Sequence, residues 1–85
     1  MSVIDLGSEF DADKVGSIFR EVTSELKRAY EKYGPFRSKH EAYGVILEEL
    51  NEVWDTIRFK EPDRRTREEA VQLAAAVIAF INDLL

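Results

Sequence analysis

The residues best suited to chemistry are glutamates in two separate segments of the chain. Glu49 and Glu52 stand three positions apart, so a helix would place both beside its apolar face as neighbours. Two like charges on a half-buried edge repel each other unless a cation lies between them. Hard carboxylate oxygens suit Mg²⁺ or Mn²⁺, and the spacing therefore predicts a divalent metal site.

A later stripe of polar and small residues supplies the other predicted ligands. It consists of Arg65, Glu68, Glu69, Gln72, Ala76, Ala79 and Asp83. If this stripe faces Glu49 and Glu52, three carboxylates and one amide oxygen meet between two helices, as in metal-binding helical bundles. A structural alternative is open: residues 66–69 match a capping box, in which Glu69 would only cap the start of a helix.

Apolar periodicity predicts three helices, separated by the prolines of the chain, and no segment alternates as a strand would. The first helix carries apolar residues at three- and four-residue steps between Val15 and Tyr33. Asp11 or Asp13 is placed to cap its start, and Gly34 ends it.

The second predicted helix begins with a capping box at residues 38–41 and runs to about Phe59. Its predicted core face consists of Tyr43, Ile46, Leu47, Leu50, Val53, Trp54 and Ile57. The third helix begins near Asp63 or Thr66 and is apolar nearly all round over residues 70–81. Two helices of the same chain can hardly enclose it, so we predict an all-α fold, a three-helix chain forming an oligomeric helical bundle.

Length and charge narrow the class of protein. The chain has 85 residues, and we expect one helical domain over residues 1–85 with a flexible N-terminus at residues 1–10. The formal net charge of -5 disfavours nucleic acid and anionic membranes as partners. The absence of cysteine excludes disulfides and thiolate zinc sites. The acidic start does not match a secretion signal, and the longest apolar run is too short to cross a membrane, so we expect a cytoplasmic protein.

The run HEAYGVILEELNEVWD, followed by REEAVQLAAAVIAFINDLL, resembles the MazG-like nucleotide pyrophosphohydrolases, an all-α superfamily. The signature of that family is EExxE followed by ExxD. It is matched here by Glu48, Glu49 and Glu52 and then by Glu69, while Gln72 stands where the family has Asp. The resemblance covers about residues 36–85.

The resemblance implies a Mg²⁺-dependent enzyme that hydrolyses a nucleoside triphosphate to the monophosphate and pyrophosphate, with a house-cleaning role on deoxy or damaged nucleotides. The implied metal ligands are Glu49, Glu52, Glu69 and Gln72, and Glu48 is the implied catalytic residue near the attacking water. Because an amide brings no charge, Gln72 weakens the expected affinity for Mg²⁺ or Mn²⁺. The alternative is a non-catalytic oligomerisation or nucleotide-binding module with a degenerate metal site.

A basic segment between the acidic motifs contains candidates for phosphate binding. These are Lys60, Arg64 and Arg65, although solvated surface charges are the simpler explanation for such a loop. Tyr33 and Phe36 flank a Gly-Pro turn and are candidates to stack on a nucleobase. The predicted partners are thus a nucleoside triphosphate and further copies of the chain, as a dimer or a tetramer.

Overall fold

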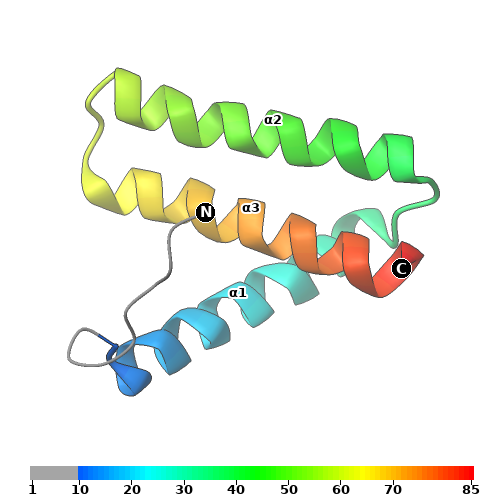
Figure 1. Ribbon diagram of the computed structural model, residues 1–85, viewed down its shortest axis with the longest axis horizontal. Helices are drawn as coiled ribbons and strands as arrows, with labels where there is room; N and C mark the ends of the chain where they lie inside the picture. Colours follow the sequence, from blue (N-terminus) through cyan, green and yellow to red (C-terminus); the bar gives the residue numbers. More distant parts are fainter. Residues whose placement is uncertain (1–9) are drawn as a thin grey trace.

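The computed structural model describes residues 10–85, which form three α-helices and no strand. The helices are α1 (Ala12–Tyr33), α2 (Lys39–Arg58) and α3 (Asp63–Leu84), as Figure 1 shows. The predicted all-α fold is confirmed for this part of the chain. The predicted flexible segment at residues 1–10 lies outside the described residues, apart from Phe10. None of the described helices is long and apolar enough to cross a bilayer.

Local hydrogen bonds fix both ends of α1. The Asp11 carboxylate accepts a hydrogen bond from the Lys14 N–H at 3.0 Å, so Asp11 rather than Asp13 caps the helix. At the other end Gly34 has a φ of 73°, in the left-handed region that favours glycine. Its N–H donates to the Tyr30 carbonyl at 2.9 Å, which satisfies one of the last carbonyls of the helix.

One half of the predicted capping box of α2 is present. The Ser38 hydroxyl accepts a hydrogen bond from the Glu41 N–H at 3.1 Å. The Glu41 carboxylate in turn accepts one from the Arg37 N–H at 3.1 Å, one residue before the cap itself. The bond from Glu41 holds the backbone of Arg37 against the start of α2.

The start of α3 decides between the two interpretations of Glu69. The helix begins at Asp63 with Pro62 as its N-cap, and no side chain caps it. Thr66 lies within the first turn, where its N–H donates to the Pro62 carbonyl at 3.4 Å. The interpretation of residues 66–69 as a capping box is therefore wrong, and the Glu69 carboxylate is free for another role.

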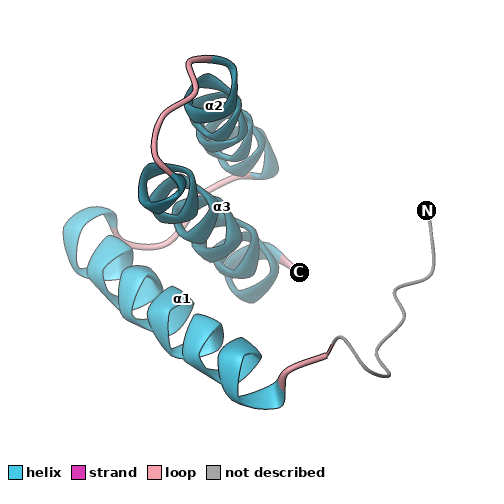
Figure 2. Cartoon of the chain, turned by 90° about the vertical axis from the view of Figure 1, so that its left-hand side faces the viewer, coloured by secondary structure: helices cyan, strands magenta, loops and turns pink. Residues whose placement is uncertain are grey.

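Helix α3 lies between the other two helices and packs against both (Figure 2). Within residues 10–85, α1 and α2 do not pack against each other. The apolar contact of α3 with α1 is made by Val22, Val71 and Ala75, with Ile18, Leu26 and Ala74 around them. On the other side, the fully buried Ala42 and the buried Thr56 of α2 pack towards α3. Small side chains at this contact allow the two helix axes to approach closely.

Within residues 10–85, most of the predicted core face of α2 is left uncovered. Its exposed members are Tyr43, Leu47, Leu50, Trp54 and Ile57. Trp54, which the sequence predicts as a packing residue, is 56% exposed. The prediction fails for the single chain because α2 turns its Ala42 and Thr56 side, rather than its most apolar side, towards α3.

A polar cluster ties the end of α3 to the connection between α1 and α2. The Asp83 carboxylate accepts hydrogen bonds from the Tyr30 hydroxyl and from the Phe36 N–H, the latter at 2.9 Å. Asn82 donates to the Tyr30 hydroxyl at 3.0 Å. Burial raises the pKa of Asp83, but the hydrogen bonds from Tyr30, Phe36 and Asn82 outweigh it and lower this pKa. The ionised Asp83 thereby holds Phe36 in place.

Candidate metal centre

Three glutamates converge where α2 packs on α3. Glu49 and Glu52 come from α2 and Glu69 from α3, and one carboxylate oxygen of each lies within 4.8 Å of the others. The i,i+3 spacing brings the first two together, and the close approach of the helices at Thr56 brings the third. The predicted convergence of three carboxylates from two helices is confirmed.

The glutamate cluster holds oxygen atoms that the described residues do not satisfy. Glu69 is only 8% exposed, and its Oε2 atom is buried without a hydrogen-bond partner. The Oε2 atom of Glu49 is buried and unpartnered as well. Buried polar atoms without partners are costly and therefore rare in folded proteins. Carboxylate oxygens in this state fit a hard divalent cation such as Mg²⁺ or Mn²⁺. The cluster contains three of the four predicted ligands, and Gln72, the fourth, lines the neighbouring cavity.

The cluster also changes the acidity of its members. Burial, followed by the nearby charge of Glu52, raises the pKa of Glu49 to about 7. Burial, followed by the neighbouring carboxyl group of Glu69, raises the pKa of Glu52. Without a metal ion Glu49 and Glu52 therefore retain protons to higher pH than isolated glutamates do.

The raised pKa of Glu49 predicts that the metal-free protein loses stability as the pH rises. Folded protein binds the Glu49 proton more tightly than unfolded protein does. The bound proton therefore stabilises the folded state fully below pH 4.5, and this stabilisation is lost as the pH approaches about 7. Because the site is partly exposed, we expect a loss of about 1–2 kcal/mol rather than the full linkage value. Urea denaturation in a chelator between pH 5 and pH 8 measures it.

The Glu49→Gln variant is the control for this pH dependence. An amide does not titrate, so the difference in unfolding free energy between wild type and variant isolates the contribution of Glu49. Parallel curves for the two proteins between pH 5 and pH 8 would contradict the assignment.

A cavity of about 540 Å³ opens beside the cluster, between α1, α2 and α3. Among the predicted site residues its walls include Glu48, Glu49, Gln72, Tyr33 and Phe36. Its floor on α3 is made of small residues, among them Ala76 and Ala79. The structure thus places Glu48, Gln72, Tyr33 and Phe36 around one cavity. Its volume lies within the range of small-molecule sites.

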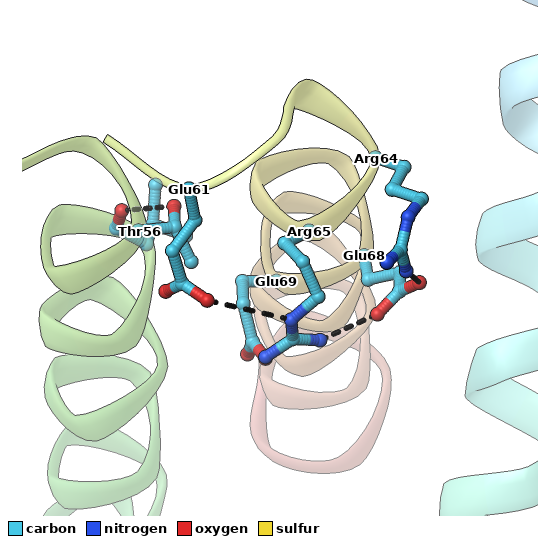
Figure 3. Close-up of polar contacts among 7 residues, drawn as sticks. Thr56, Glu61, Arg64, Arg65, Glu68 and Glu69 are labelled. Atoms are coloured by element: carbon cyan, nitrogen blue, oxygen red, sulfur yellow. Dashed lines mark hydrogen bonds and ion pairs between the residues drawn. The ribbon is translucent and has the colours of Figure 1, made fainter. Parts of the chain in front are cut away.

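The three predicted phosphate-binding cations lie apart from this cavity. Arg65 contacts Glu61, Glu68 and Glu69, as Figure 3 shows, and its guanidinium lies next to the cluster. Arg64 is exposed, 4.0 Å from Glu68. Lys60 lies in the turn after α2, where its φ is 55°. None of the three predicted cations lines the cavity.

Two other arginines line the cavity, and the sequence analysis does not single them out. Arg28 of α1 forms an ion pair with Glu25 at 2.7 Å. Arg37 lines the cavity at the start of α2, and within residues 10–85 its side chain belongs to none of the ion pairs. Arg37 directly precedes the capping box, a signal that would have located it at the entrance of α2.

Comparison of the chain with protein-family models, curated proteins and solved structures finds no match.

Proposed function

We propose that the protein is a Mg²⁺- or Mn²⁺-dependent nucleoside triphosphate pyrophosphohydrolase that acts on deoxy or damaged nucleotides. One observation carries the proposal. The unpartnered Oε2 atoms of Glu49 and Glu69 lie at a cluster of three carboxylates, and Glu49 also lines a cavity of suitable size for a nucleotide. The resemblance of the two acidic motifs to the MazG-like enzymes supports the choice of reaction.

The divalent ion would be held by Glu49, Glu52 and Glu69, with Gln72 on the wall of the adjoining cavity, and would neutralise the phosphate charges. Glu48 lines the cavity next to Glu49 and would accept a proton from the attacking water. Attack on the α-phosphorus breaks the bond to the β-phosphate oxygen, and pyrophosphate leaves with that oxygen.

The remainder of the cavity offers contacts for the rest of the nucleotide. Arg37 has no ion-pair partner among the described residues, so its guanidinium can bind phosphate oxygens, and Arg28 can exchange Glu25 for a phosphate. Tyr33 and Phe36 provide aromatic rings at the same wall. Asp83 orders this wall through its hydrogen bond from the Phe36 N–H. Such a site has both the charge and the stacking surface that a nucleotide requires.

A second copy of the chain completes the proposed assembly. Helix α3 also exposes apolar side chains, at Val77, Ile78 and Ile81. On the wheel of α3, Ile81 points roughly 160° away from Ala79, which lines the cavity. The assembly face and the cavity therefore lie on opposite sides of α3. An apolar face of this extent on two helices is typical of an interface, and we assign it to a homodimer or a tetramer.

The alternative function is a non-catalytic oligomerisation or nucleotide-binding module. Two observations favour it: Gln72 brings no charge to the cavity, and the apolar face has a use that needs no metal. In that case the glutamate cluster would be a degenerate site.

Pyrophosphate release separates these functions. The purified protein is incubated with ordinary, deoxy and modified nucleoside triphosphates, with Mg²⁺, with Mn²⁺ or with a chelator. The proposal expects stoichiometric monophosphate and pyrophosphate that depend on the metal. Nucleotide binding without turnover, measured by calorimetry on the same panel, would support the non-catalytic alternative instead.

A further inference from the structure

Arg65 occupies a position that the proposed function does not explain. In residues 10–85 it is the only cation that forms an ion pair with a carboxylate of the cluster. Its Nη2 atom lies 3.1 Å from Oε1 of Glu69, while Oε2 of Glu69 has no partner. The guanidinium therefore satisfies one half of the most buried carboxylate at the site.

The other contacts of Arg65 differ from this one in their exposure. Glu68 contacts Nη1 of Arg65, and Glu61 lies 3.8 Å from its Nε atom (Figure 3). The side chains of Glu61 and Glu68 are 38% and 48% exposed, whereas that of Glu69 is 10% exposed. Exposed ion pairs contribute little, because water screens the charges. Of the three contacts, the ion pair with Glu69 is therefore the one that water screens least.

We infer that Arg65 is the internal counter-cation of the carboxylate cluster and competes with the divalent ion for Glu69. The inference rests on the proposed metal site. In the metal-free protein the positive charge of Arg65 offsets the mutual repulsion of Glu49, Glu52 and Glu69. A divalent ion on Glu69 repels the guanidinium and takes over this role.

The surroundings of Arg65 allow such an exchange. Glu61 and Glu68 already contact the guanidinium, so Arg65 keeps two anionic partners when it leaves Glu69. The exchange requires only a change of side-chain rotamer at a partly exposed position. Arg65 accordingly acts on the metal ligand, and contact with substrate phosphate is not its primary role.

Arg65→Gln tests the inference, with Arg64→Gln as the matched control. Both variants remove one positive charge from the first turns of α3, but Arg64 reaches only the exposed Glu68. Calorimetric titration with Mn²⁺ alone is expected to show binding on the order of tenfold tighter in Arg65→Gln than in wild type, because one repulsive charge is gone. Its Tm in a chelator is expected to fall. Arg65→Lys keeps the charge and is expected to stay near wild type in both measurements.

The outcomes separate this inference from the proposed function. Equal or weaker Mn²⁺ binding in Arg65→Gln overturns the competition, and a Tm loss equal to that of Arg64→Gln overturns the counter-cation role. If wild type binds no Mn²⁺, the proposed metal site fails. The metal-free melts then decide the counter-cation role by themselves: a larger loss of Tm in Arg65→Gln supports it, and equal losses refute it.

Discussion

Glu52→Gln is expected to abolish Mg²⁺-dependent pyrophosphate release, with kcat/KM at least about 100-fold lower than in wild type, because a direct metal ligand is lost. The same variant should show no rise of Tm with Mg²⁺ or Mn²⁺, whereas wild type gains stability from an ion that binds only the folded state. In a chelator its Tm is expected to equal or exceed that of wild type, since a neutral amide relieves the repulsion of Glu49 and Glu69.

Two control variants sharpen this result. Glu48→Gln is expected to lower kcat while keeping the metal-dependent rise of Tm, because Glu48 borders the cavity without belonging to the cluster. Glu31→Gln removes an exposed carboxylate of α1 and should change neither measurement. A Glu52→Gln protein that still responds to Mg²⁺ as wild type does would refute the metal centre.

The helices and the cluster could be predicted because their causes are local. Asp11, Ser38 and Gly34 mark helix ends through hydrogen bonds that span three or four residues. The i,i+3 spacing of Glu49 and Glu52 is fixed by helix geometry, and the single question left to tertiary structure was which face of α3 they meet.

The features that escaped prediction depend on how the helices pack. Apolar content alone assigned Trp54 to a core, but the chain packs α2 on α3 through Ala42 and Thr56, where small side chains permit a closer approach. Similarly, the side-chain type of Arg65 suits phosphate binding, and only its ion pair with the buried Glu69 points to the role of counter-cation that we infer. The spacing of residues along one helix does not determine which neighbouring residue a long side chain contacts.

Leu50→Glu and Trp54→Glu are expected to convert the assembled protein into a folded monomer. Both side chains are exposed in the single chain, so a carboxylate there costs the monomer little, whereas a buried, unpaired carboxylate in an interface costs several kcal/mol. Association should weaken by at least about 100-fold, as for the loss of an apolar anchor residue. Sedimentation at micromolar concentration, with circular dichroism to verify helicity, measures both effects.

Phe19→Glu is the matched control, because it places the same charge at an exposed apolar residue of α1 rather than on the α2 and α3 face. Ala75 is unsuitable for this purpose: it is 3% exposed and packs against Val22 within the chain, so a charge there would unfold the monomer itself. Wild-type protein that sediments as a compact monomer would exclude the assembly. If Phe19→Glu dissociates the assembly while Leu50→Glu does not, the interface lies on α1, and the exposed face of α2 and α3 must be assigned to a different partner.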